Sequence, residues 1–265
     1  MSAEAFANHF TVLREGAGQL GLALSAHQLS QFARFRDLLL DWNTRINLTA
    51  VTDPAEVEVR HFLDSLTCLE ALPASLRERR VRLLDIGSGA GFPGLALAIA
   101  CPRWEITSLD STSKKIRFQE EVIADLGLEN ARAIAGRAEE FGRQREWRGR
   151  YDVVTARAVA ALPTLLEFCC PFARVGGYVV MPKKGDLAEE IETGSRAAAA
   201  LGVRLLAPVA VSLPPLNDGR LLLVARQDRP CPSQYPRAAG APVKRPLGMT
   251  SGGGRPEPQS GSSRK

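Results

Sequence analysis

Short apolar runs alternate with amphipathic stretches between residues 81 and 226, and this alternation predicts a repeated strand–helix order. The runs that we interpret as strands are 81–86, 105–110, 131–135, 151–156, 176–181, 203–211 and 220–226. The helices expected between them are 93–100, 113–126, 137–142, 161–174 and 186–201. This order is typical of a doubly wound α/β fold with a seven-stranded, mostly parallel sheet. Ligands of such sheets bind beyond the C-terminal ends of the strands.

The segments on either side of this region have different patterns. Apolar residues recur at helical spacing from His27 to about Asn43, and Asp53 followed by proline opens a second helix that ends near Pro73. The tail is rich in Pro, Gly, Ser and Arg, and we expect its last part, 251–265, to be disordered. The predicted parts of the chain are an N-terminal helical region (1–75), an α/β domain (76–228) and a basic tail (229–265).

Composition restricts the class of protein. The 265 residues, 45% of them hydrophobic, can bury a sizeable core. Apolar runs stay shorter than a membrane span and residues 1–25 lack a secretory pattern, so we expect no membrane partner. We also expect a cytoplasmic monomer. The five cysteines have no metal-ligand spacing, which predicts free thiols and no metal.

The net charge of +5 is unevenly distributed along the chain. Residues 229–265 contain seven Lys and Arg residues and one acidic residue, so the tail carries +6 and residues 1–228 carry −1. A polyanionic partner therefore fits the tail, or a local basic patch on the body, better than the body as a whole. One such patch is a predicted loop that contains Trp147 and the arginines Arg143, Arg145, Arg148 and Arg150.

The stretch with the clearest chemical meaning follows the first predicted strand. Residues 83–94 read Leu-Leu-Asp-Ile-Gly-Ser-Gly-Ala-Gly-Phe-Pro-Gly, which predicts a strand, a glycine-rich turn and a helix start. Such a turn brings backbone N–H groups close to a ligand. Gly89 to Gly94 fits the dinucleotide fingerprint, with Asp110 following at a suitable distance. Asp85 at the strand end instead favours a cationic group, such as the ammonium of S-adenosylmethionine (SAM), unless it only caps the loop.

Several stretches together resemble the RsmG family, also called GidB, of bacterial small-subunit rRNA methyltransferases. They are 47–51, 60–65, the glycine loop with Phe92-Pro93-Gly94, 110–111, 136–140 and 156–160. The resemblance extends over roughly residues 25–247. It implies a Rossmann-like class I SAM-dependent methyltransferase that makes 7-methylguanosine in 16S rRNA of the small ribosomal subunit.

The resemblance also implies roles for particular residues in binding SAM. It places Gly87 and Phe92 in the SAM loop, Ala138 and Glu139 around the adenine, and Asp110 at the ribose hydroxyls. Asp110 equally fits the cap of the following helix. One of Glu139 and its neighbour Glu140 is expected to be a solvated surface charge. To this set the residues themselves add Asp85, Gly89 and Gly91 of the loop, and Arg157.

Arg157 is the candidate catalytic residue, because it follows a predicted strand and the resemblance places it near both the cofactor and the target base. It fits the SAM carboxylate, an RNA phosphate or the guanine O6. The alternative is a structural role, either in an ion pair with Asp152 or on a helix face. Lys183 and Lys184, beyond another strand end, are the candidate contacts to RNA phosphates.

Three residues of the helical region have open assignments. Asn47 is either a substrate contact or a buried side chain that bonds the backbone. His61 and Asp64 lie three positions apart on one predicted helix face, which suits either a structural pair or a joint contact with the glycine loop.

The expected chemistry is in-line displacement of the methyl group from the sulfonium. Guanine N7 carries a free lone pair at neutral pH, so we expect no dedicated general base, only positioning and exclusion of water. Two other functions stay open, namely methylation of a non-RNA substrate and a non-catalytic RNA-binding role in ribosome assembly.

Overall fold

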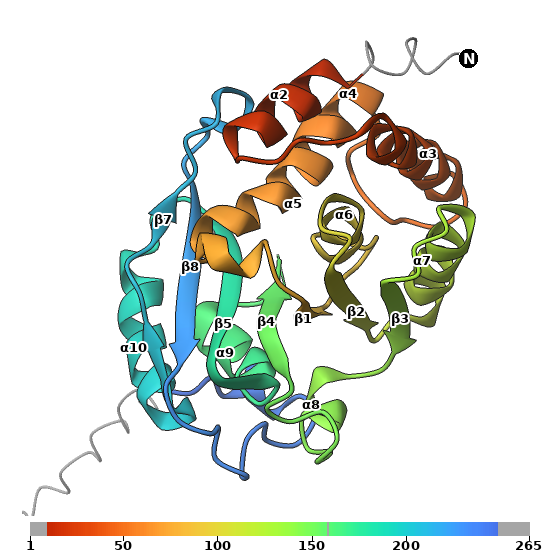
Figure 1. Ribbon diagram of the computed structural model, residues 1–265. Helices are drawn as coiled ribbons and strands as arrows, with labels where there is room; N and C mark the ends of the chain where they lie inside the picture. Colours follow the sequence, from red (N-terminus) through yellow and green to blue (C-terminus); the bar gives the residue numbers. More distant parts are fainter. Residues whose placement is uncertain (1–9, 158, 249–265) are drawn as a thin grey trace, which may run out of the picture.

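An eight-stranded sheet with helices on both faces lies at the centre of the computed structural model, which describes residues 10–157 and 159–248 (Figure 1). Its strands are β1 (Val81–Ile86), β2 (Trp104–Asp110), β3 (Ala131–Ala135), β4 (Tyr151–Ala156), β5 (Ala173–Lys184), β6 (Val203–Leu205), β7 (Val209–Ala210) and β8 (Arg220–Gln227). The order is β3-β2-β1-β4-β5-β8-β6, and β7 also pairs with β8. Strands β1 to β5 run parallel to one another, whereas β8 is antiparallel to β5, β6 and β7.

The Rossmann-like α/β prediction is confirmed, with three main differences in detail. Strand β5 extends three residues beyond each end of the predicted run 176–181, because its ends pair with β4 and β8. The run 203–211 forms two short strands rather than one, because Pro208 between them has no N–H to donate to a ladder. The sheet therefore has eight strands instead of seven. The helix expected at 161–174 ends at Cys169, since Pro171 follows and β5 already begins at Ala173.

Helices pack on the two faces of the sheet because successive strand residues point to opposite sides. Leu83 and Val153 face one apolar core, while the next residues, Leu84 and Val154, face a second core. Helices α6 (Gly94–Ala100) and α7 (Ser113–Asp125) cover the first face. Helices α8 (Ala138–Phe141), α9 (Leu162–Cys169) and α10 (Ala188–Leu201) lie together on the other side (Figure 1).

The N-terminal helices pack on the same side of the sheet as α6 and α7, partly against these two helices and partly against β5 and β8. They are α2 (Thr11–Gln19), α3 (Ala26–Asn43), α4 (Pro54–Val57), η1 (Glu58–Leu63), α5 (Asp64–Leu66), η2 (Thr67–Ala71) and η3 (Ala74–Leu76). Ser25 and Gln28 form a capping box at the start of α3, and the Gln28 amide also donates to the carbonyl of Ile99 in α6 at 2.7 Å. Asp53 caps α4, as its position before proline predicts. Segment η1 is one π-helical stretch, a feature that is frequent at functional sites.

The chain after β8 packs along α8, α9 and α10 and includes α11 (Ala241–Lys244). Arg237 forms a bidentate ion pair with Glu167 of α9, whose side chain is fully buried. Arg148 donates to four carbonyl oxygens, three of them in the segment 231–235. This arginine of the predicted basic loop therefore fixes the segment that follows β8. The predicted disordered stretch 251–265 lies outside the described residues.

One short 3-10 turn, η4 (Pro214–Leu216), precedes β8. Across 10–157 and 159–248, none of the helices combines the length and the apolar character needed to span a membrane.

Candidate cofactor and substrate site

Strand register brings the candidate residues to one edge of the sheet. Ile86, the last residue of β1, pairs with Leu109 of β2 and with Ala156 of β4. The glycine loop, Asp110 and Arg157 therefore begin side by side. Because β8 runs antiparallel to β5, its first residue, Arg220, pairs with Lys184 at the same edge.

The glycine loop has a backbone that other residues rarely adopt. Gly87, Gly89 and Gly91 have φ angles of 64°, 58° and 92°. At Gly87 a Cβ atom would also lie 2.6 Å from Cγ2 of Val159. Asp110 fixes the loop, because one of its carboxylate oxygens accepts the Gly89 N–H at 2.9 Å and the other accepts the Thr112 N–H at 2.8 Å.

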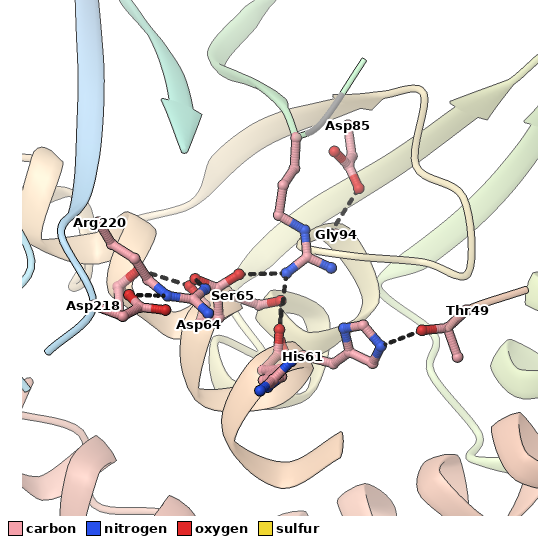
Figure 2. Close-up of polar contacts among 11 residues, drawn as sticks. Thr49, His61, Asp64, Ser65, Asp85, Gly94, Asp218 and Arg220 are labelled. Atoms are coloured by element: carbon pink, nitrogen blue, oxygen red, sulfur yellow. Dashed lines mark hydrogen bonds and ion pairs between the residues drawn. The ribbon is translucent and has the colours of Figure 1, made fainter. Parts of the chain in front are cut away.

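Asp85 is fully buried beneath this loop. Its Oδ2 accepts the Gly94 N–H at 2.9 Å (Figure 2). Its Oδ1 accepts the Thr155 hydroxyl, also at 2.9 Å. Burial raises the pKa of the Asp85 carboxyl to about 7, and the hydrogen bonds from Gly94 and Thr155 oppose that rise. Asp85 thus caps the loop, which is one of its two predicted roles, and its contact with a ligand ammonium stays a prediction.

Phe92 joins the loop to the N-terminal helices. Its ring stacks on Phe35 at 5.1 Å and on His61 at 4.7 Å between ring centroids. The Arg157 guanidinium lies 5.4 Å from the centre of the same ring. The Phe92 side chain is 4% exposed, so its contact with a cofactor would come from its backbone.

His61 points from η1 toward Thr49, whose hydroxyl lies 2.7 Å from its Nε2 (Figure 2). Burial, reinforced by the charge of Arg157, lowers the pKa of His61 to about 4, so the imidazole is neutral at neutral pH. Nδ1 is buried and, within the described residues, has no hydrogen-bond partner. The sequence interpretation did not identify Thr49 as its partner, because a short polar stretch gives no sign of which hydroxyl faces a ring.

Asp64, on the same helical segment, binds two arginines from distant parts of the chain (Figure 2). Its Oδ2 accepts Nη1 of Arg157 at 2.5 Å, and its Oδ1 accepts Nη1 of Arg220. The alternative that paired Arg157 with Asp152 is wrong, since Asp152 instead accepts from Arg79 and Arg174.

The network continues from Arg220 through Asp218 to Lys184, at 2.9 Å for each contact. Arg157, Lys183, Lys184 and Arg220 all line a pocket of about 270 Å³ beside the loop. This pocket, which we call the arginine pocket, has Asp64 in its wall.

Known proteins match most of this chain in sequence. Residues 28–214 match the GidB family, described as rRNA small subunit methyltransferase G. The chain is 43% identical over 241 residues to ribosomal RNA small subunit methyltransferase G of Desulforamulus reducens, covering 91% of this chain and 99% of the relative. It is 46% identical over 237 residues to the protein of the same name in Deinococcus radiodurans, covering 89% and 92%.

The chain belongs to the GidB family. The resemblance stated from the sequence is therefore confirmed. A solved structure from Klebsiella pneumoniae, provisionally named an O-methyltransferase, superposes with a TM-score of 0.51 at 14% identity over 74% of this chain and 90% of that one. At this identity the superposition supports the fold alone.

Two of the residues assigned to RNA in this GidB chain have structural partners. Lys183 Nζ donates to the carbonyl of Ala160 and pairs with Glu190, both at 2.7 Å, so it holds the loop after β4 against α10. Lys184 is paired with Asp218 but remains exposed. Their contacts with RNA stay predictions.

Asn47 is exposed, so the alternative in which it is a buried residue that bonds the backbone is wrong for it. That role belongs to Asn43, whose side chain accepts the N–H groups of Leu48 and Thr49 and donates to the Thr49 carbonyl. The exposed Asn47 stays a candidate substrate contact of the GidB site.

Ala138 and Glu139 begin α8, beyond the end of β3. As the first residue of a helix, Ala138 has an N–H without an acceptor inside that helix, which suits a ring nitrogen. Glu139 is buried and accepts the N–H of Gly240 at 3.1 Å, whereas Glu140 is the exposed one of the pair, as expected. Contact of either residue with an adenine stays a prediction. In the described part of this GidB chain, no three His, Cys, Asp or Glu residues are arranged to hold a metal ion.

Proposed function

We propose that this chain transfers a methyl group from SAM to N7 of a guanine in the 16S rRNA of the small ribosomal subunit. Membership of the GidB family, whose relatives are named as small-subunit rRNA methyltransferases, supports the reaction class and the cofactor. The observation that carries the rest is the position of Arg157, which lies between the glycine loop and the arginine pocket. We further propose that the enzyme acts as a cytoplasmic monomer.

The residues present fit SAM. The positive φ angles of the glycine loop bring its backbone close to a ligand, and Asp110 retains lone pairs for ribose hydroxyls beyond the two N–H groups that it already accepts. Asp85 beneath the loop supplies a carboxylate for the amino-acid end. When bound, SAM supplies a methyl group on a sulfonium, which is activated without help from the protein.

Arg157 and His61 position the reactants and exclude water, and neither has to transfer a proton. N7 of guanine attacks through its own lone pair, so no side chain has to remove a proton first. The neutral His61 ring, packed on Phe92, excludes water from this side of the loop without adding positive charge beside a product base that becomes cationic. Arg157 is held by Asp64, which fixes its orientation; because Asp64 is shared with Arg220, it offsets only part of the charge of Arg157.

The raised pKa of Asp85 leads us to expect that cofactor binding depends on pH. With its pKa near 7, the carboxyl is largely protonated at pH 6 and largely ionised at pH 8, and only the ionised form attracts an ammonium group. We expect the affinity for S-adenosylhomocysteine to rise about tenfold from pH 6 to pH 8, and Asp85→Asn to lose this dependence. Calorimetric titration at the two pH values measures both, and a flat wild-type profile would exclude an electrostatic role for Asp85.

The test of the proposed function is transfer of labelled methyl groups from SAM to small ribosomal subunits and to naked 16S rRNA, both from a strain that lacks this chain. We expect one 7-methylguanosine per 16S rRNA, together with binding of S-adenosylhomocysteine and none of NAD. Label that enters a protein or a small molecule instead would favour the non-RNA methyltransferase. RNA binding without any transfer would favour the assembly factor.

A further inference from the structure

The arginine pocket lies apart from the proposed cofactor site. The cofactor candidates follow β1, β2 and β3, whereas the pocket is bounded by the ends of β4 and β5, the start of β8 and the helical segment that carries Asp64. The glycine loop does not contribute to its lining, and Arg157 is the one residue that belongs to both regions. A ligand of this pocket is therefore a part of the substrate rather than of SAM.

Charge in and around the pocket suits an anion. Four cations line it, and the acids that contact them are Asp64, Asp218 and Glu190, which leaves one net positive charge. Lys183 is bound to Glu190 and an adjacent carbonyl, so it has less freedom than the two arginines to turn toward a ligand.

The two arginines are arranged as a pair by a single carboxylate. Asp64 is 4% exposed, and each of its oxygens binds one guanidinium through Nη1. Arg220 also uses Nε for Asp218. Within the described residues, Nη2 of each guanidinium donates to no protein acceptor, so both Nη2 groups can bind a ligand.

We propose that the arginine pocket is a phosphate subsite, in which Arg157 and Arg220 bind one phosphodiester of the RNA and Asp64 is the positioning residue that holds the two guanidiniums together. The inference rests on the proposed function, because the RNA substrate supplies the phosphate. Guanidinium groups match phosphate oxygens in geometry as well as charge. With both side chains already ordered by Asp64, little rotamer entropy is lost when the phosphate binds. Since Arg157 also lies over Phe92, the phosphate belongs to the target guanosine or to its direct neighbour.

Asp218 has the opposite effect in this arrangement. It binds Nε of Arg220 and Nζ of Lys184, two donors that would otherwise face the incoming phosphate. Its removal therefore strengthens RNA binding, whereas loss of Asp64 weakens it, although both substitutions delete one negative charge.

The experiment compares Asp64→Asn, Arg220→Lys and Asp218→Asn with the wild type. Binding of naked 16S rRNA is measured over a range of salt concentrations, and kcat and KM are measured with small ribosomal subunits from a strain that lacks this chain. We expect the first two variants to bind RNA about tenfold more weakly. Neither substitution removes a cation, so their salt slopes should stay close to that of the wild type, and the weaker binding should come from the lost guanidinium geometry. Asp218→Asn should bind RNA more tightly, and all three should bind S-adenosylhomocysteine as the wild type does.

Asp125→Asn is the matched control, because Asp125 also binds an arginine through both oxygens, but on the surface of α7. It should leave RNA binding and turnover unchanged. Unaltered RNA affinity in Asp64→Asn and Arg220→Lys would overturn the subsite, and so would weaker S-adenosylhomocysteine binding in both. Should Asp64→Asn unfold, Arg220→Lys and Asp218→Asn still have to change RNA affinity in opposite directions. A wild-type chain that binds RNA without methylating it would refute the proposed function alone, since the binding data test the subsite separately.

Discussion

Replacement of Arg237 by alanine is expected to lower the free energy of unfolding by about 3–5 kcal/mol, the usual effect of leaving one charge of a buried pair without its partner. Glu167 is fully buried in α9, and its oxygens accept from the backbone and the guanidinium of Arg237. Alanine at position 237 would leave this carboxylate with the backbone N–H alone. Urea unfolding followed by circular dichroism measures the change.

Arg245→Ala is the matched control, because it removes an arginine from the same segment without breaking the ion pair with Glu167. Arg245 is exposed, so its removal deletes the same charge and should change the unfolding free energy by less than about 0.5 kcal/mol. Equal stability of the two variants would show that the chain after β8 does not depend on the Glu167 pair.

Replacement of Gly87 by alanine is expected to weaken binding of S-adenosylhomocysteine by tenfold or more. The φ angle of 64° costs a residue with a Cβ about 1–2 kcal/mol, and the new atom would lie 2.6 Å from Cγ2 of Val159. To relieve both, the loop has to move, and with it the N–H groups that face the ligand. Calorimetric titration of the purified variant measures the loss.

Gly149→Ala is the control that separates the effect of backbone strain from the effect of a position in the glycine loop. Gly149 has a φ angle of 62°, nearly that of Gly87, but its Cβ would meet no atom within 4 Å among the described residues. This variant should lose a similar amount of stability and bind S-adenosylhomocysteine normally. Normal binding by Gly87→Ala as well would exclude the glycine loop from the cofactor site.

The sequence predicted the elements of the sheet well where the apolar runs are short and bounded by turn residues. Strands β1, β3 and β4 have the predicted bounds. Two errors fall where proline intervenes: Pro208 divides one run into two strands, and Pro171 shortens α9. A third is β5, which extends beyond the predicted run 176–181 at both ends, even through Pro182. Periodicity reports which residues are apolar, but not where a missing N–H interrupts a ladder.

The site was predictable only in part, for a different physical reason. The residues that follow β1, β2 and β4 were correctly predicted to lie near one another, because the C-terminal ends of parallel strands share one edge of the sheet. The partners of Arg157 were not, because a side chain that ends a strand can reach any element at that edge. Its partner Asp64 is 93 residues away in the sequence, while the nearer Asp152 lies among other arginines. For the same reason Arg220 was missed, since nothing in its local sequence distinguishes it from a surface arginine.

Nucleoside mass spectrometry of 16S rRNA tests the central claim most directly. RNA from a strain that lacks this chain is compared with RNA from the same strain supplied with the wild-type chain or with Gly87→Ala. We expect one 7-methylguanosine to be absent from the strain without the chain, to return with the wild-type chain and not to return fully with Gly87→Ala. An unchanged content of 7-methylguanosine in the strain without the chain, or loss of a different methylated nucleoside, would contradict it.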